Sequence, residues 1–436
     1  MDKKLLMFQQ KMKKEGLNPL AIDIFSSYYQ KLVSGDAGLI SRETISPLGS
    51  GSVKNYETLD DAAETNIGKF AILKLNGGLG TSMGLKKAKS LLPVKGSMTF
   101  LDIIAKQILI LRQKSKVNVP FLLMNSFNTQ ADTIAHLAKY KNLQVEGLRL
   151  DFLQNKFPKI LADGFEPFED EDDKLTWNPP GHGEVYTSLF TSGILDKLLA
   201  RGIKYLFISN SDNLGSEYDA KILNYFASSK LDFMMEVCTR TQMDKKGGHL
   251  AQNKDGRLVL REVAQTPSSE MEEFSDISLY KYFNTNSLWV NLVSLKAKLA
   301  KNPIFELPLI VNNKKVKGKS VIQLETAMGA AIFSFEKSKV LLVPRQRFIP
   351  VKKTNDLLSL WSDIYYLTQD YQIKRASKIL PKVELDVDFF GSIDQLQKKV
   401  KITPSLKDCK QFVVKGDYLF DKKEVFSGEV VLEKRR

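Results

Sequence analysis

The chain has 436 residues, of which 43% are apolar and 26% charged, and its net charge is +14. This is the composition of an ordinary globular protein of two or three domains. The positive charge favours a nucleic acid or a polyanionic small molecule as partner. Because the basic residues are spread through the chain and no RNA-binding motif is present, we expect no specific nucleic-acid binding.

The two cysteines, Cys238 and Cys409, lie far apart in the sequence, which argues against a disulfide framework and against a thiolate zinc site. Gln9 and Gln10 interrupt the apolar start of the chain, and no apolar run approaches about 18 residues. We therefore expect neither a signal peptide nor a membrane-spanning helix, and we predict a cytoplasmic protein.

Residues 1–66 are predicted to form a polar, helical N-terminal segment with a break at Leu17–Leu20. From Phe70 onward, buried strands alternate with amphipathic helices, and Thr99 and Thr129 are plausible N-caps. The predicted strands are Phe70–Leu75, Phe121–Met124, Tyr205–Ile208 and Phe233–Val237. Strands separated by helices favour an α/β domain with a mostly parallel sheet covered on both faces, which we place at residues 67–347.

Two other regions stand out from this alternation. The acidic run from Glu166 to Asp173 is expected to be a solvated loop rather than a metal site. After about Pro350, a helix is expected over roughly Asp356–Leu367, followed by short β-rich stretches. These stretches are Val383–Val387, Val400–Ile402, Phe412–Val414 and Val425–Val431. They predict a small β domain within residues 348–436.

The strongest chemical signal is the glycine-rich loop that follows the first predicted strand. It reads LNGGLGTSMG over residues 75–84, and Lys86, Lys87 and Lys89 come directly after it. Such a loop lets backbone N–H groups approach phosphate oxygens, and the lysines add positive charge. The spacing matches neither GxxxxGK[ST] nor GxGxxG, which weakens an ATPase or dehydrogenase interpretation. A tight turn with surface lysines is the alternative, but four glycines together with the lysines favour a phosphate site.

Two further motifs carry polar residues in constrained loops. In WNPPGHGE (177–184), prolines and glycines surround His182, which could contact a ligand or simply face solvent. In ISNSDNLG (208–215), Asp212 follows the end of a buried strand, where open α/β sheets bind ligands and metals. Asp212 could hold Mg²⁺ against a phosphate or could cap the next turn.

Taken together, the motifs resemble those of one family, the eukaryotic-type UDP-glucose pyrophosphorylases. They occur in the order of that family and cover roughly residues 70–360. The motifs are KLNGGLGTSMG (74–84), LMNSFNT (123–129), NPPGHGE (178–184), SNSDNLG (209–215), KGGHL (246–250), FNTNSLW (283–289), IQLETAMGAA (322–331) and RFIPVK (347–352). The resemblance implies a Rossmann-like nucleotidyltransferase domain with a mixed, mostly parallel sheet, followed by a small left-handed β-helix. It also implies transfer of the uridylyl group of UTP to glucose 1-phosphate, giving UDP-glucose and pyrophosphate.

The resemblance further assigns roles to single residues. Lys89 and Lys352 match the catalytic lysines, and Asp212 matches the position that holds Mg²⁺, the implied cofactor. Gln154 matches the glutamine that reads the uracil edge. The implied nucleotide-binding residues are Leu75, Asn76, Gly77, Gly78, Lys89, Gln154, Gly181 and Lys352, and the implied sugar-phosphate residues are His182, Asn210, Asn286 and Glu325. No protein nucleophile is needed, because positioning and charge neutralisation dominate phosphoryl-type transfer.

The sequence departs from the family at Lys87-Ala88, where Gly-Pro is usual, and the C-terminal β region is short. Two alternatives to the proposed activity are a related pyrophosphorylase with another sugar 1-phosphate and a non-catalytic sugar-nucleotide sensor. The charged C-terminal tail and the net charge lead us to expect a monomer, with weak dimerisation as the alternative.

Overall fold

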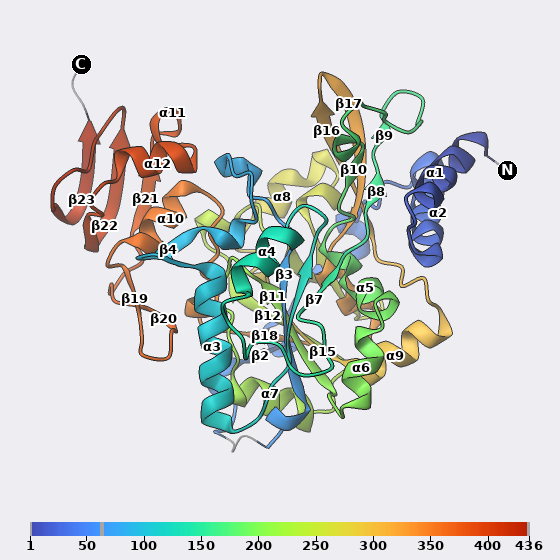
Figure 1. Ribbon diagram of the computed structural model, residues 1–436, viewed down its shortest axis with the longest axis horizontal. Helices are drawn as coiled ribbons and strands as arrows, with labels where there is room; N and C mark the ends of the chain where they lie inside the picture. Colours follow the sequence, from blue (N-terminus) through green and yellow to red (C-terminus); the bar gives the residue numbers. More distant parts are fainter. Residues whose placement is uncertain (1, 62–64, 434–436) are drawn as a thin grey trace.

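The structure, a computed structural model, describes residues 2–61 and 65–433, and an eleven-stranded sheet lies at its centre (Figure 1). Eight strands are adjacent in one path, and β13 pairs with β15 of that path and joins the last two strands to it. The path runs β2 (Val53–Asn55), β18 (Ser338–Leu342), β12 (Phe233–Thr239), β15 (Tyr282–Asn291), β11 (Tyr205–Asn210), β3 (Phe70–Asn76), β6 (Phe121–Asn125) and β7 (Asp151–Leu153), and the additional strands are β1 (Ile45–Pro47), β13 (His249–Asn253) and β14 (Leu258–Arg261).

The sheet is mixed, with a parallel half that carries the motifs described above. Strands β11, β3, β6 and β7 are parallel to one another, whereas β15 is antiparallel to both of its neighbours β11 and β12. All residues of β3 are buried, as expected for a strand covered on both faces. The α/β class and the large, mostly parallel sheet are therefore confirmed, and all four predicted strands are present.

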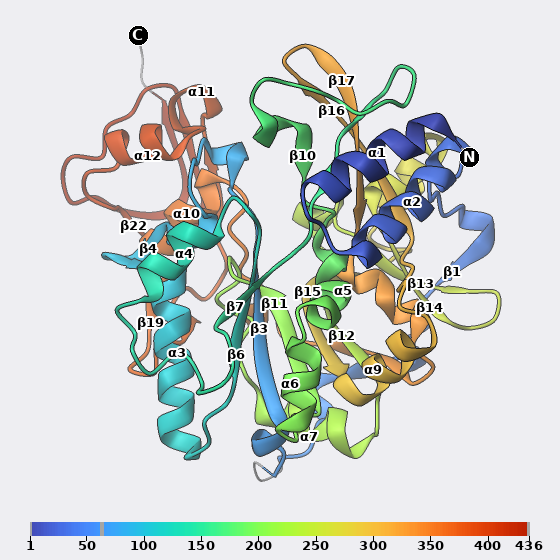
Figure 2. The same cartoon turned by 45° about the vertical axis from the view of Figure 1, so that its right-hand side comes forward.

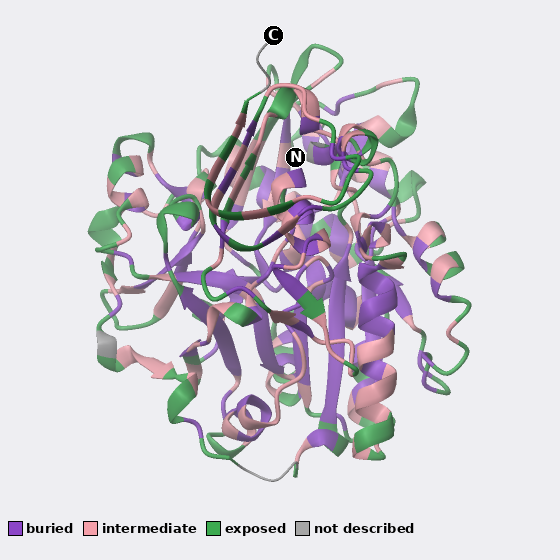
Figure 3. Cartoon of the chain, turned by 90° about the vertical axis from the view of Figure 1, so that its left-hand side faces the viewer, coloured by how far each residue is buried: buried purple, intermediate pink, exposed green. Residues whose placement is uncertain are grey.

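Helices cover both faces of the sheet (Figures 1 and 2). Helices α3 (Phe100–Ser115), α4 (Gln130–Leu137) and α7 (Ala220–Ser228) share one apolar core with Ile72 of β3. Helices α5 (Val185–Thr191), α6 (Ile194–Ala200) and α9 (Leu292–Lys301) share another with Leu73. Figure 3 shows that the strands between these helices are almost entirely buried. The short helix α8 (Met271–Ser275) follows β14.

The predicted N-caps gave different results. Thr99 caps α3 with a capping box, in which its hydroxyl accepts the Asp102 N–H and the Asp102 carboxylate accepts the Thr99 N–H. Thr129 directly precedes α4, but its side chain makes no capping bond; its hydroxyl instead accepts the Ser126 N–H. The Thr129 hydroxyl therefore stabilises the turn after β6 rather than the start of α4.

The N-terminal segment contains α1 (Lys3–Lys14) and α2 (Pro19–Val33), with Leu17–Asn18 between them as predicted. The two helices pack against each other and against small sheets beside the main one. These sheets are β8 (Phe157–Pro158) with β10 (Trp177–Asn178), and β16 (Leu309–Val316) with β17 (Lys319–Thr326) and β9 (Ile160–Leu161). Phe8, Phe25 and Tyr29 form a buried aromatic cluster there with Phe157 and Trp177.

The acidic run 166–173 is a mostly exposed loop, as predicted. Lys11 of α1 pairs with Glu169, and Lys317, between β16 and β17, pairs with Asp170. Among the residues that the structure describes, no group of three or more His, Cys, Asp or Glu side chains could hold a metal ion. Through these two ion pairs, the loop contacts both α1 and the β16–β17 hairpin.

The C-terminal region departs from the sequence prediction in two places. Helix α10 spans Thr354–Trp361 only, and β19 (Tyr365–Leu367) pairs with β20 (Ile373–Arg375), so the helix predicted to reach Leu367 was too long. Lys95 donates to the carbonyls of Trp361 and Ser362, which stabilises this early helix end. Val400–Ile402 was wrongly predicted as a strand; Val400 forms only an isolated bridge with Phe420.

The other β-rich stretches form one three-stranded parallel sheet, β21 (Lys382–Leu385), β22 (Ser405–Lys415) and β23 (Val425–Glu433). Helices α11 (Val387–Phe390) and α12 (Ile393–Lys399) pack beside it, and the hairpin β4 (Pro93–Lys95) with β5 (Met98–Thr99) contacts α10. A left-handed β-helix stays a prediction. Within residues 2–61 and 65–433, no helix combines the length and apolar character needed to span a bilayer.

Candidate active site

A cleft with about 900 Å³ of empty space opens at the carboxyl ends of the parallel strands. Loops after β3, β6, β7 and β11 meet there, which is the edge where open α/β sheets bind ligands. The residues that line the cleft are Leu75, Gly77, Gly78, Lys89, Met124, Gln154, Pro179, Gly181, His182, Asn210, Ser211, Asp212 and Glu325. The structure thus brings together all the predicted site residues except Asn76, Asn286 and Lys352.

The glycine loop and Gln154 are in close contact. A Cβ atom at Gly77 would lie 2.7 Å from Nε2 of Gln154, so this approach requires glycine. The Gln154 backbone is fixed because its N–H donates to the Asn125 carbonyl at 2.9 Å. Ser126 Oγ in turn donates to the Gly77 carbonyl at 2.9 Å. The loop after β3 and the residue after β7 therefore form one wall of the cleft.

Glu184 supports this wall from behind, and sequence analysis gave it no role although it belongs to the NPPGHGE motif. Its buried carboxylate accepts the backbone N–H of Asn155 at 3.2 Å and also accepts the Asn155 side-chain amide and the Ser188 hydroxyl. Burial raises the pKa of Glu184 to about 7. Because Asn155 follows Gln154, these bonds limit the movement of Gln154.

His182 lies on the opposite wall with its tautomer fixed by the backbone. Its Nδ1 accepts the Met328 N–H at 2.9 Å, which leaves Nε2–H as a donor. Desolvation lowers the pKa of His182 to about 4, so the ring is neutral near pH 7. Gly181 precedes it with φ +78°, and a Cβ there would lie 2.4 Å from the Thr326 carbonyl oxygen. Glycine is therefore required for the loop to pack on the end of β17.

Glu325 of β17 completes this wall. Its Oε1 accepts Asn312 Nδ2 of β16 at 3.0 Å, and burial raises its pKa. The Asn312 bond holds the carboxylate at the cleft and uses only one of its two oxygens. Sequence analysis did not single out Asn312, because only the hairpin register places it beside Glu325.

Lys89 and Asp212 form an ion pair inside the cleft, with side chains 16% and 19% exposed. Lys89 is held by its N–H, which donates to the Gly78 carbonyl at 3.1 Å. Ala88, which stands where the family has proline, has φ −51°, close to the range that proline adopts. Lys87 is not among the described residues with a positive φ, so the usual glycine is not required there. The Lys87-Ala88 departure therefore leaves the turn before Lys89 intact.

The chemistry of these side chains fits a magnesium ion. Mg²⁺ is usually bound by one or two carboxylates together with substrate phosphates and water. Asp212 supplies one carboxylate in the cleft, and the Lys89 ammonium now occupies one of its oxygens. A nucleotide would give both groups new partners, phosphate oxygens for Lys89 and a metal ion for Asp212.

The three predicted residues outside the cleft lining have different environments. The Asn76 side chain is buried, where it donates to Asn125 and Thr133 at 2.8 Å and accepts from Ser211 at 3.1 Å. Asn76 therefore links the end of β6, helix α4 and the loop after β11, and it does not line the cleft. The Asn76 side chain is thus bonded within the protein, and its assignment as a nucleotide-binding residue stays a prediction.

Asn286 lies at a β-bulge in β15, in the left-handed conformation with φ +57°. Its backbone N–H and side-chain oxygen are both bonded to the Asn284 amide at 2.8 Å. Lys352 is exposed, and its backbone lies beside Asp212, because the Val351 N–H donates to the Asp212 carbonyl at 3.3 Å. The structure therefore places the Lys352 backbone near the cleft without its side chain lining it.

Comparison with known proteins gives a consistent result. A family described as UTP–glucose-1-phosphate uridylyltransferase matches residues 22–426. The uridylyltransferase of that name from Hordeum vulgare is 41% identical over 419 residues, which are 94% of this chain and 88% of the relative. The crystal structure of UDP-glucose phosphorylase from Trypanosoma brucei has a TM-score of 0.90 and 41% identity, covering 98% of this chain and 94% of that chain. A variant of the Leishmania major UDP-glucose pyrophosphorylase in complex with UDP-glucose has a TM-score of 0.92 and 40% identity, with coverages of 99% and 95%.

Proposed function

This chain belongs to the UTP–glucose-1-phosphate uridylyltransferase family, and on that premise we propose how its own residues carry out the reaction. The family membership confirms the resemblance seen in the motifs of residues 74–352. The enzyme transfers the uridylyl group of UTP to glucose 1-phosphate and releases pyrophosphate. In the transfer, a phosphate oxygen of the sugar phosphate forms a bond to the α-phosphorus of UTP while the bond to pyrophosphate breaks.

The nucleotide occupies the wall formed by the glycine loop and Gln154. The Gln154 amide reads the uracil edge, and the Glu184–Asn155 bonds keep it in place. Leu75, Gly77 and Gly78 contact the nucleoside through the backbone, and Gly181 contacts the base from the other side. The close contact between Gly77 and Gln154 supports this assignment, because it fixes an amide at the cleft surface.

The sugar phosphate occupies the opposite wall. His182 donates from Nε2–H to a phosphate oxygen, and its low pKa keeps this donor neutral. Asn210 and the free oxygen of Glu325 bond the glucose hydroxyls, and Asn286 contributes from the bulge of β15. The carboxylate held by Asn312 supports this assignment, since hydroxyls are good donors to a fixed carboxylate.

Charge neutralisation comes from Lys89, Lys352 and Asp212. Asp212 would hold one Mg²⁺, which when bound neutralises phosphate charge and orients the triphosphate. Lys89 leaves Asp212 for the phosphates when nucleotide enters, and Lys352 stabilises the charge that develops as pyrophosphate departs. Electrostatic stabilisation by such pre-placed groups usually lowers the barrier of an enzyme reaction more than any other effect.

The observation that carries this proposal is the grouping of Lys89, Gln154, His182, Asp212 and Glu325 in one cleft. A coupled pyrophosphate-release assay with UTP, CTP and ATP against glucose 1-phosphate and N-acetylglucosamine 1-phosphate tests it. We expect turnover with UTP and glucose 1-phosphate, and loss of most activity in Lys89→Ala and Lys352→Ala with unchanged circular dichroism. Comparable turnover with ATP, or full activity in Lys89→Ala, would contradict the assignment.

Several broader expectations belong to the same proposal. We place the enzyme in the cytoplasm, supported by two free, buried cysteines, which are usual in a reducing compartment. We divide the chain at 1–66, 67–347 and 348–436, and take the parallel sheet β21–β23 as a short left-handed β-helix. We propose a monomer, with weak dimerisation as the alternative, because the net charge of +14 opposes association between copies of the chain.

A further inference from the structure

The segment Arg347–Lys352 runs directly beside the loop that carries Asp212. The Val351 N–H donates to the Asp212 carbonyl at 3.3 Å, and Pro350 forms an antiparallel bridge with Asn213. The second proposed catalytic lysine therefore follows a residue that is bonded to the backbone of the proposed metal ligand. The contacts between these two stretches of backbone therefore set the position from which the Lys352 side chain extends.

The Asn213 side chain joins the two segments. It is 2% exposed, its Oδ1 accepts the Ile349 N–H at 2.9 Å and the Gly215 N–H at 3.2 Å, and its Nδ2 donates to the Arg347 carbonyl at 3.1 Å. A Cβ atom at Gly215 would lie 2.4 Å from the Gln346 carbonyl oxygen. The segments thus approach more closely than any residue other than glycine would permit at that position.

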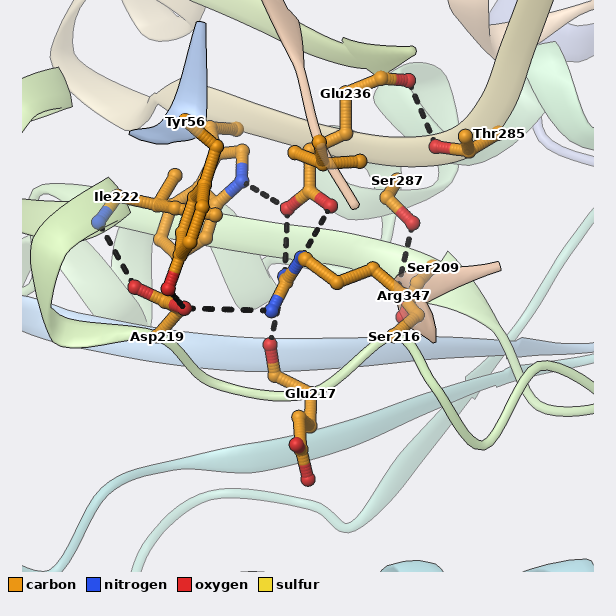
Figure 4. A network of polar contacts seen from close by, with 12 residues as sticks. Tyr56, Ser209, Ser216, Glu217, Asp219, Ile222, Glu236, Thr285, Ser287 and Arg347 are labelled. Atoms are coloured by element: carbon orange, nitrogen blue, oxygen red, sulfur yellow. Dashed lines mark hydrogen bonds and ion pairs between the residues drawn. The ribbon is translucent and has the colours of Figure 1, made fainter. Parts of the chain in front are cut away.

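Arg347 fixes the beginning of the segment through a buried network of polar contacts (Figure 4). Its guanidinium donates to both carboxylate oxygens of Glu236 at 2.7 Å and to the Glu217 carbonyl at 3.0 Å. Trp289 Nε1 also donates to Glu236 at 2.9 Å. Because this buried ion pair is bidentate and further bonded, the Arg347 end of the segment has little freedom.

Asp356 fixes the other end. One of its oxygens, Oδ2, accepts the N–H groups of Lys352 and Lys353 at 2.7 and 2.8 Å, at the start of α10. Neither Asp356 nor Asn213 lines the cleft. Asp356 therefore holds the Lys352 backbone directly, and Asn213 holds the segment that leads to it.

We propose that Asn213 and Asp356 are positioning residues for the transfer step, which set the Lys352 backbone relative to Asp212. The inference rests on the proposed role of Lys352. A reacting or stabilising group that is misplaced by about 1 Å can cost on the order of 10²-fold in rate, which is the physical reason for two separate attachments. The attachments leave the side chain free to extend into the cleft once the phosphates are present.

The test is a double-mutant cycle on kcat with both substrates saturating. Asn213→Ala should lower kcat by about 10-fold or more, and Asp356→Ala by a few-fold, since each loosens the backbone without removing the lysine. The dissociation constant for UTP, measured by calorimetry, should change less than kcat does. In a Lys352→Ala background, measured at raised enzyme concentration, each further substitution should lower kcat less than about twofold, because the lysine through which it acts is gone.

Asn291→Ala is the matched control for Asp356→Ala. Asn291 caps α9 through two backbone N–H groups, and it pairs with Tyr205 at the start of β11, whereas the cleft lies at the other end of that strand. Asn291→Ala should lower the melting temperature and leave kcat unchanged. If Asn213→Ala fails to fold, the same double-mutant cycle with Lys352→Ala is measured with Asp356→Ala and Asn213→Asp. Full activity in Lys352→Ala would remove the lysine from the proposed function. Two results would overturn the positioning role alone. One is a strong loss of kcat in Lys352→Ala together with wild-type kcat in Asn213→Ala and Asp356→Ala. The other is that Asn213→Ala and Asp356→Ala lower kcat by the same factor with and without Lys352→Ala.

Discussion

The contact between Gly77 and Gln154 allows a sharp prediction for nucleotide recognition. In Gly77→Ala, the new methyl group would lie 2.7 Å from Nε2 of Gln154. Carbon and nitrogen atoms that are not bonded seldom approach within about 3.4 Å, so the amide has to move by roughly 0.7 Å. The Gln154 backbone is bonded to Asn125, so the side chain has to turn away instead.

The size of the effect follows from hydrogen-bond geometry. A bond near 2.9 Å that lengthens by roughly 0.7 Å is no longer a hydrogen bond. Losing one such bond and leaving its partner unsatisfied costs about 1–3 kcal/mol, which corresponds to about 5- to 150-fold in affinity. We therefore expect Gly77→Ala to raise the KM for UTP by a factor in that range and to leave the KM for glucose 1-phosphate nearly unchanged.

The assay is initial-rate kinetics by pyrophosphate release, with UTP varied at saturating glucose 1-phosphate and then the reverse. Gly68→Ala is the matched control, because a Cβ there has no atom within 4 Å and its φ is not positive. That variant should behave as the wild type. An unchanged KM for UTP in Gly77→Ala, or an equal rise in both KM values, would refute the role of Gln154 in reading the base.

Other residues of the site and the charge of the chain lead to four more predictions. Asp212→Asn should lower kcat by on the order of 10²-fold and raise the Mg²⁺ concentration needed for half-maximal rate; near-normal metal dependence would exclude Asp212 as ligand. Asn312→Ala should raise the KM for glucose 1-phosphate several-fold with little effect on UTP, because Glu325 loses the bond that holds it. The pKa of His182 is lowered from 6.5 to about 4 in the folded protein, so between those pH values the unfolded chain binds a proton that the folded chain does not. The free energy of unfolding, measured with denaturant, should therefore be full above about pH 6.5 and fall toward pH 4. It should fall less in His182→Gln. Light scattering at micromolar concentration and moderate salt should give the mass of a monomer, and a stable tetramer or octamer would disprove that expectation.

Local patterns in the sequence were enough to locate most of the fold and most of the cleft. Buried strands such as Phe70–Asn76 read as largely apolar runs. Their loops carry glycines and polar residues, and the order of the parallel strands predicts where these loops meet. Thr99 could be predicted as a cap because the Asp102 side chain needed for the capping box lies three residues later. In these cases the determining contacts are close in sequence.

The errors arose where distant contacts decide the outcome. Helix α10 ends at Trp361 because Lys95, far away in the sequence, bonds its last carbonyls. Asn76 belongs to a glycine-loop motif, yet the partners of its side chain come from β6, α4 and the loop after β11, which the motif alone does not reveal. Asn312 and Glu184 were missed for the same reason. Asn312 acts on the cleft residue Glu325, and Glu184 acts on Asn155 next to Gln154, each through a tertiary hydrogen bond.

The packing of the N-terminal helices has a consequence for synthesis of the chain. The aromatic cluster of α1 and α2 packs on Phe157 and Trp177 and also on Leu309 and Leu324, which lie far later in the sequence. At roughly 5–20 residues per second, the last of these partners leaves the ribosome about 15–60 s after the helices do. During that interval the Phe8 and Phe25 rings can contact each other, but they are not yet fully buried. The aromatic residues of α1 and α2 therefore reach their full burial only when the β16–β17 hairpin is complete.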